Sequence, residues 1–383
     1  MNSLDILESL IAFPTVSRTP NIELIEYVRA MLESHGVHCI RVDSDDGRNA
    51  NLYAHLGPND KPGIMLSGHT DVVPVSGQAW NVDPFALTAK DGRLYGRGTA
   101  DMKGFVACAV SALLKASKRD LSIPLQLALS YDEEIGCVGV RRLIDLLESS
   151  PYQSAYCLVG EPTGLVIAVG HKGKTSLRAT CTGREVHSAL APSGLNAIHL
   201  ACDLIGILRN HQTELREHGA SDSDYDVPYT TIHAGVISGG IALNIVPREC
   251  VVDFEIRNLE TDDALELLKS IEHDAANVVA TAREHCPEAD IQIEIVTRYP
   301  GLNTPVDADV VEFVKSLTGG NSTRKVAFGT EGGLFQERLG IATVVCGPGS
   351  MDQGHKPDEF ITREQLDQCD AMMDALVDKL ATQ

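Results

Sequence analysis

The sequence of 383 residues predicts an α/β protein, an α/β/α domain into which a smaller ferredoxin-like domain is inserted. Up to about Gly170, short apolar runs alternate with helical segments, which is typical of a sheet covered on both faces. From about Lys174 the predicted order becomes βαββαβ, the ferredoxin-like arrangement, and after Pro300 the alternation of helices and strands returns. A chain of this length is also expected to form more than one domain.

The first part of the chain predicts buried strands connected by helices. The strands are the apolar runs Gly63–Ser67, Leu125–Ser130 and Ala155–Val159. The helices are Met102–Ser117 and Val138–Glu148, where apolar residues recur at helical spacing. Strands of this kind, apolar on both faces, are typical of a parallel sheet between layers of helices.

The middle and last parts complete the prediction. Six segments form the βαββαβ series, namely Lys174–Thr182, Leu195–Asn210, Thr230–Ser238, Arg248–Arg257, Thr261–Arg283 and Ile291–Arg298. The last part then returns to α/β character with the helix Val306–Leu317, the strand Ile341–Val345 and the helix Arg363–Leu380. We therefore expect one domain to comprise residues 1–172 and 299–383, and the inserted domain to comprise residues 173–298.

The charge of the chain excludes some classes of partner. The net charge is −21 and the isoelectric point is near 4.9. A nucleic-acid-binding protein or a protein that docks on anionic membrane needs basic surface, so we expect neither kind of partner. No apolar run reaches membrane-spanning length.

The cysteines and the N-terminus predict a cytoplasmic protein. All ten cysteines are isolated and none forms a CxxC pair, which excludes a zinc ribbon and fits a reducing compartment. The first residues, Met1 to Asp5, lack a basic region followed by an apolar one, so we expect no signal peptide.

Acidic residues and histidines follow the predicted strands. His69 comes directly after the first strand, and Asp132, Glu133 and Glu134 end the second. Glu161 ends the third strand, while Asp101 precedes a helix and His355 follows the strand Ile341–Val345. Because ligands bind at the carboxyl ends of the strands in open α/β sheets, we expect these clusters to meet at one edge.

The residue types indicate a metal site. Two histidines and several carboxylates without cysteine suit zinc, cobalt or manganese. Two neighbouring ions would need one bridging carboxylate and further ligands on each side. Asp101 can bridge, with His69 and Glu161 on one ion and Glu134 and His355 on the other, although the sequence does not dictate this partition. Taken singly, each motif also fits an ordinary solvated turn or a core histidine.

Two further residues fit supporting roles. Glu133 and Glu134 are adjacent at a strand end, so one can bind metal while the other stays free as a general base. Asp71, two residues after His69, is placed to hold the other nitrogen of that imidazole.

The motifs, taken in order, resemble the di-zinc metallohydrolase family that includes acetylornithine deacetylases, succinyl-diaminopimelate desuccinylases, aminoacylases and related carboxypeptidases. The resemblance rests on five motifs: Gly-His-Thr-Asp at 68–71, Gly-Thr-Ala-Asp-Met-Lys-Gly at 98–104, Asp-Glu-Glu at 132–134, Gly-Glu-Pro-Thr at 160–163 and Gly-His-Lys-Pro-Asp-Glu at 354–359. It runs through essentially the whole chain. It implies a metallohydrolase-type catalytic domain, two divalent ions, a bridging role for Asp101 and the same partition of ligands. It also implies that Glu133 is the general base and that Asp71 orients His69.

The resemblance extends to the inserted domain, which in the family serves as a lid and dimerisation domain. His187 lies in a loop that, in relatives, reaches the active site of a neighbouring subunit and stabilises an oxyanion. Asn244 and Arg257 match positions that contact the substrate carboxylate. The residues leave other roles open, because His187 can cap a loop and Arg257 can pair with a carboxylate of its own domain.

Within the family, the acetylornithine deacetylases are the most similar group. Val227-Pro228-Tyr229-Thr230-Thr231, Gly170-His171-Lys172-Gly173 and Thr330-Glu331 carry this closer resemblance. It implies conversion of N2-acetyl-L-ornithine to L-ornithine and acetate in arginine biosynthesis, by a homodimer with zinc or cobalt. Desuccinylation, broad aminoacylase or dipeptidase action, and a non-catalytic metal- or ligand-binding role stay open. The loop at Gly239–Ala242 departs from the group, since Ile241 makes it more apolar.

Overall fold

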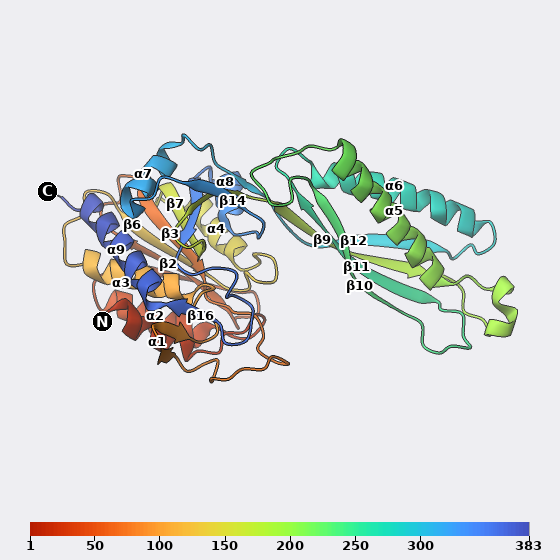
Figure 1. Ribbon diagram of the computed structural model, residues 1–383, viewed down its shortest axis with the longest axis horizontal. Helices are drawn as coiled ribbons and strands as arrows, with labels where there is room; N and C mark the ends of the chain where they lie inside the picture. Colours follow the sequence, from red (N-terminus) through yellow and green to blue (C-terminus); the bar gives the residue numbers. More distant parts are fainter. Residues whose placement is uncertain (383) are drawn as a thin grey trace. The chain divides into compact units, whose positions relative to one another are not determined.

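The protein is described by a computed structural model, which covers residues 1–382. The chain divides into two compact units (Figure 1), and each unit has its own cluster of buried hydrophobic residues. Unit 1 comprises Met1–His171, Leu302–Val326 and the chain from Thr330 onward. Unit 2 comprises Lys172–Gly301 and the short piece Ala327–Gly329.

Unit 1 contains most of the helices and strands of the described chain. Before unit 2 they are α1 (Ser3–Ile11), α2 (Ile22–Glu33), β1 (His38–Asp43), β2 (Ala50–Leu56), β3 (Gly63–His69), β4 (Thr88–Lys90), β5 (Arg93–Tyr95), α3 (Lys103–Ala116), β6 (Leu125–Ser130), α4 (Val140–Ser149), β7 (Ser154–Pro162) and β8 (Ile167–His171). After unit 2 they are β13 (Leu302–Asn303), α7 (Asp309–Thr318), β14 (Thr323–Val326), α8 (Gly332–Leu339), β15 (Ala342–Gly347), β16 (Phe360–Thr362) and α9 (Arg363–Leu380).

The large sheet of unit 1 has, within residues 1–382, nine strands in the order β1-β2-β6-β3-β7-β15-β8-β13, with β14 beside β8. Its central strands β6, β3, β7 and β15 are parallel neighbours. Every residue of β3 and β6 is buried, as expected for parallel strands covered on both faces. The predicted strands are confirmed, and β3 continues two residues further than expected, to His69.

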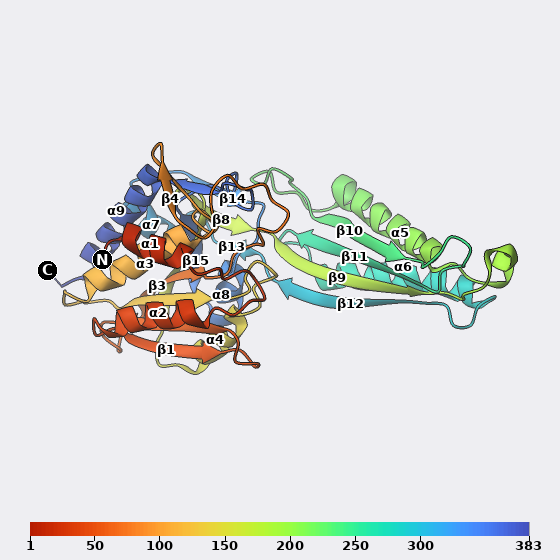
Figure 2. The same cartoon turned by 90° about the horizontal axis from the view of Figure 1, so that it is seen from below.

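Helices cover both faces of this sheet. On one side α3 packs on β3, β6 and β7, and α1 and α9 pack on α3. On the other side α4 and α8 contact each other and the sheet (Figures 1 and 2). The helix α3 is buried along nearly its whole length, which explains why its sequence is almost entirely apolar or small. The predicted α/β/α fold class is confirmed.

Unit 2 has the predicted βαββαβ order. Its elements are β9 (Gly173–Thr182), the 3₁₀ helix η1 (Ser188–Ser193), α5 (Ala197–His218), β10 (Thr231–Gly239), β11 (Glu249–Asn258), α6 (Ala264–Arg283) and β12 (Asp290–Tyr299). The strands pair in the order β10-β11-β9-β12, and α5 and α6 pack together beside this sheet (Figure 2). This is the ferredoxin-like arrangement.

The helix α5 differs from the prediction, because it continues eight residues beyond the expected end at Asn210. Leu215 in this extension packs against the core of unit 2, and Arg216 and His218 lie in the last turn, where positive charge suits the helix dipole. In the described chain, no helix combines the length and the apolarity that a membrane span requires.

Candidate functional site

Parallel strands bring the predicted clusters together in unit 1. The strand β3 ends at His69, and β6 ends just before the turn that carries Glu133 and Glu134. Glu161 lies one residue before the end of β7. Because β6, β3 and β7 are adjacent and parallel, their carboxyl ends form one edge of the sheet.

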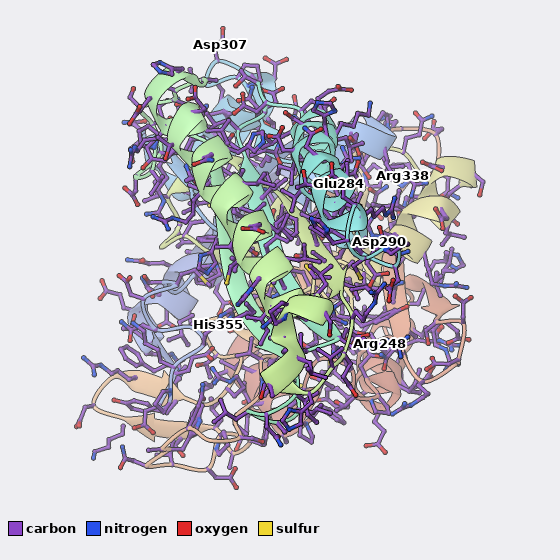
Figure 3. The ribbon with its side chains drawn as sticks, turned by 90° about the vertical axis from the view of Figure 1, so that its right-hand side faces the viewer. Arg248, Glu284, Asp290, Asp307, Arg338 and His355 are labelled. Carbon is purple, nitrogen blue, oxygen red and sulfur yellow. The ribbon has the colours of Figure 1, made fainter. Side chains whose placement is uncertain are left out.

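Asp101 lies between two imidazoles. Its Oδ1 atom is 3.0 Å from Nε2 of His69, and its Oδ2 atom is 3.1 Å from Nε2 of His355. Each oxygen of the carboxylate therefore faces a different histidine, which is the geometry of a bridging ligand. Asp101 is buried, whereas the side chain of His355, labelled in Figure 3, is 42% exposed.

Each histidine also faces a second carboxylate. Nε2 of His69 is 3.6 Å from Oε1 of Glu161, and Nε2 of His355 is 3.1 Å from the carboxylate of Glu134. The structure thus brings all five predicted ligands together around Asp101 and the two histidines. The ligand atoms of His69, Asp101 and Glu134 also lie within 4.8 Å of one another, so distance alone does not assign Glu134 to one ion.

Glu133 lies beside the first group. Its ligand atoms and those of His69 and Glu161 lie within 4.8 Å of one another, so distance alone does not separate it from a ligand. Its Oε1 atom accepts a hydrogen bond of 3.3 Å from the thiol of Cys137, and the residue is 9% exposed. Glu133 is therefore a buried carboxylate beside the five proposed ligands, and its hydrogen-bond partner is the thiol of Cys137.

Asp71 holds more than the predicted imidazole. Nδ1 of His69 is 2.9 Å from the backbone oxygen of Asp71 and 3.5 Å from its Oδ1 atom, so the main chain is the nearer partner. The carboxylate of Asp71 accepts hydrogen bonds from the backbone N–H of Glu133 at 3.0 Å and of Glu134 at 3.4 Å. Asp71 therefore also fixes the turn that presents these two glutamates.

Burial and mutual repulsion perturb the carboxylates. Burial raises the pKa of Glu133 and of Glu161 well above the usual value, and neighbouring carboxylates raise both further. Burial and the charge of Asp101 raise the pKa of Glu134 to about 7. Hydrogen bonds to Asp101 and Glu134 raise the pKa of His355 to about 10. The carboxylates of these residues and Asp101 are thus stabilised by positive charge placed among them.

These observations fit divalent metal ions. Imidazole nitrogens and carboxylate oxygens, without a thiolate, are the donors that zinc, cobalt and manganese take. Cations placed between the carboxylates would remove the repulsion that raises their pKa values. His69 and Glu161 with Asp101, and Glu134 and His355 with Asp101, would hold the two ions.

His187 and Asn244 lie together in unit 2. His187 and Ile245 form an isolated antiparallel β-bridge. The backbone oxygen of Asn244 accepts a hydrogen bond of 2.9 Å from the N–H of Ser188. Nδ1 of His187 accepts from the N–H of Ala189 at 3.1 Å, so this histidine caps η1. Both His187 and Asn244 are exposed.

Arg257 lies elsewhere in unit 2, near the far end of β11. Its Nε atom is 3.0 Å from Oε1 of Glu255, and Nη1 is 3.4 Å from the hydroxyl of Tyr299. Asn244 precedes β11, and from Glu249 to Arg257 alone the strand advances about 27 Å at roughly 3.4 Å per residue. One small ligand cannot touch Asn244 and Arg257 of the same copy.

The structure adds a carboxylate to which the sequence assigned no role. Glu331, at the start of α8, is 2% exposed and accepts hydrogen bonds from the hydroxyls of Ser130 and, at 3.2 Å, Ser67. Glu331 therefore connects β3 and β6 near the strand ends that carry His69 and Glu133. Thr330-Glu331 stands in a recognisable motif, but no local pattern tells where the side chain points.

Comparison with known proteins settles the family. The sequence model of the family described as "Peptidase family M20/M25/M40" matches residues 65–379 of the chain. The chain belongs to this family. The acetylornithine deacetylase of Myxococcus xanthus is 36% identical over 376 residues, covering 96% of this chain and 94% of that protein. The acetylornithine deacetylase of Pasteurella multocida is 34% identical, covering 99% and 98%.

Solved structures share the fold of this M20-family chain. The M20 family metallo-carboxypeptidase of Sulfolobus solfataricus has a TM-score of 0.79 at 20% identity, covering 99% of each chain. A dinuclear metal-binding M20 peptidase of Bacillus subtilis has a TM-score of 0.68 at 14% identity, covering 99% of this chain and 97% of its own. Together with the curated relatives, these similarities identify a metal-dependent hydrolase.

Glu331 makes stability depend on pH. Burial raises its pKa to about 7, so its contribution to stability is complete below the unfolded value near 4.3 and is lost as pH rises through 7. We predict that Glu331→Gln, in metal-stripped protein, gains on the order of 3 kcal/mol relative to wild type between pH 4 and pH 8. Urea unfolding across this range measures the difference. Parallel pH profiles for the two proteins would contradict the assignment.

Proposed function

We propose that this M20-family chain is a two-metal acetylornithine deacetylase, which hydrolyses N2-acetyl-L-ornithine to L-ornithine and acetate in arginine biosynthesis. The observation that carries the two-metal site is the carboxylate of Asp101, which turns one oxygen towards each histidine. The relatives at 34–36% identity, which bear the name acetylornithine deacetylase, support the substrate. Zinc is the proposed ion and cobalt the alternative, because the donors are nitrogen and oxygen.

Glu133 is the proposed general base. When bound, two divalent ions polarise a carbonyl group and make a water molecule acidic. Glu133 accepts the proton of the attacking water and delivers it to the departing nitrogen. Glu133 lies beside His69 and Glu161, and the thiol of Cys137 donates a hydrogen bond to its Oε1 atom and fixes that oxygen.

Arg257 is the proposed partner of the substrate α-carboxylate. Its planar guanidinium suits a bidentate contact with a carboxylate. In this structure one of its nitrogens, Nε, already pairs with Glu255. His187 is the proposed donor to the oxyanion, and Asn244 the second contact to the substrate.

A homodimer explains how these residues serve one substrate. Because Asn244 and Arg257 lie far apart in one copy, both can contact the same small molecule only if they come from two copies. We therefore propose that residues 173–298 form a lid and dimerisation domain, and that His187 and Asn244 act on the site of the partner. Residues 1–172 and 299–383 form the catalytic domain in this proposal.

The cytoplasm is the proposed location. All ten cysteines are free thiols and most are buried, as expected of a protein in a reducing compartment. The acidic chain offers nothing that favours nucleic acid or anionic membrane as a partner.

Glu133→Ala tests the general base. We predict that this variant loses nearly all turnover and keeps the metal content of the wild type, because the five proposed ligands stay in place. Metal analysis and turnover on the same preparation measure both quantities. Residual activity close to that of the wild type would remove Glu133 from this role, and loss of metal would make it a ligand.

A substrate panel tests the acyl group and the amino acid. We predict that zinc-loaded or cobalt-loaded enzyme hydrolyses N2-acetyl-L-ornithine with a higher kcat/KM than N-succinyl-diaminopimelate, N-acetyl-methionine or a dipeptide. Higher activity on the succinyl compound would favour a desuccinylase, and on the last two an aminoacylase or dipeptidase. No hydrolysis of any amide would favour a non-catalytic metal-binding protein.

Mixed dimers test the action of His187 across the interface. Glu133→Ala and His187→Ala are each expected to be almost inactive, because each lacks one part of every site. After co-expression, the mixed dimer contains one site with both Glu133 and a partner's His187, so activity returns. No recovery, or a monomer in sedimentation at assay concentration, would contradict the proposal.

A further inference from the structure

A buried carboxylate holds the backbone that carries Asp101. Oε1 of Glu359 accepts hydrogen bonds from the N–H groups of Gly98 at 3.0 Å, Ala100 at 2.9 Å and Asp101 at 3.1 Å. Glu359 is 1% exposed and lies 258 residues from Asp101 in the chain. Three contacts to one oxygen fix the direction of this short segment.

Arg97 connects this carboxylate to a second loop. Its Nη1 atom is 2.5 Å from Oε2 of Glu359, and both side chains are almost completely buried. Its Nη2 atom donates to Oε1 of Gln78 at 2.5 Å, and the guanidinium lies 5.0 Å from the ring centre of Trp80. The charge of Glu359 is thus compensated inside the protein.

Gln78 extends the network to His355. Its Oε1 atom accepts from Arg97 and, at 3.0 Å, from the indole N–H of Trp80, while its Nε2 atom donates to the backbone oxygen of His355 at 2.9 Å. His355 has φ 63°, in the left-handed region that is unfavourable for a residue with a side chain. The hydrogen bond from Gln78 holds this backbone in place.

A second contact supports the same pair of loops. The N–H of Asn81 donates to Oδ1 of Asp358 at 2.8 Å, and its side-chain amide donates to Oδ2 at 2.5 Å. The segment from Gln78 to Asn81 therefore contacts the loop of His355 at two points.

We infer that Glu359, Arg97 and Gln78 are positioning residues of the metal centre, which hold Asp101 and His355 at a fixed separation. This inference rests on the proposed two-metal site. Glu359 and Arg97 act on Asp101, which faces both ions. Gln78 contacts the backbone of His355, so it serves the ion held by His355 and Glu134 and not the ion held by His69 and Glu161.

Gln78 is the residue that tests this division. It is half-buried, so its replacement removes little packing. Gln78→Ala removes all its contacts, whereas Gln78→Glu keeps an acceptor for Arg97 and loses the donor to His355. Gln368→Ala is the matched control, because Gln368 is exposed on α9. His355→Ala removes a proposed ligand itself.

The experiment titrates zinc into the stripped full-length proteins against a chromophoric chelator. We expect two ions in wild type and in Gln368→Ala. In Gln78→Glu, which keeps the acceptor for Arg97, we expect one ion of unchanged affinity and one weakened by about 10–100-fold, the usual effect of removing a residue that orients a metal ligand. In Gln78→Ala, which also removes an acceptor of Arg97, we expect the same ion to be weakened most. Wild-type affinity for both ions in the Gln78 variants would overturn the inference. Equal weakening of both ions in Gln78→Glu would also overturn it, because that is the effect of a general loss of structure.

His355→Ala separates this inference from the proposed function. If His355→Ala loses one ion and the Gln78 variants bind both ions normally, the metal site stands and the positioning role is wrong. If His355→Ala also binds two ions with wild-type affinity, His355 is not a ligand, so the proposed ligand set is wrong and the positioning role fails with it.

Discussion

The arrangement around Asp101 places a constraint on the rest of unit 1. Glu134 and Glu161 lie near this carboxylate and Glu133 lies beside them, at the ends of buried strands, where burial and repulsion raise the pKa values of the three glutamates. Such a cluster is unfavourable unless positive charge and hydrogen-bond donors compensate it. Two histidines, backbone N–H groups and, in our proposal, two metal ions supply that compensation.

The fold holds the proposed metal ligands at fixed positions. Adjacent parallel strands bring His69, Glu133 and Glu161 to one edge, and no antiparallel arrangement would align three strand ends in this way. The carboxylate of Asp71 holds the turn after β6, and Glu359 holds the segment of Asp101. The buried residues around the cluster thus orient the ligands, as is usual in metal sites.

The sequence predicts the ligand clusters because each follows a short apolar run, and such runs are the strongest local signal of a buried strand. It does not predict Glu331, Gln78 or Arg97, because their partners lie far away in the chain and no local period marks them. The sequence also predicts an end of α5 that is eight residues too early, because the contact of Leu215 with the core exists only in three dimensions. Asn244 and Arg257 were both expected near the substrate carboxylate. Only the length of β11 shows that one copy cannot bring them together.

A crystal structure of the zinc-soaked protein would locate the two metal ions that we propose Asp101 joins. With data collected at the zinc absorption edge, we expect two anomalous peaks about 3.5–4 Å apart, one on each side of the Asp101 carboxylate. One peak should lie beside His69 and Glu161, the other beside Glu134 and His355. A single peak, or peaks away from Asp101, would show that Asp101 does not join two ions.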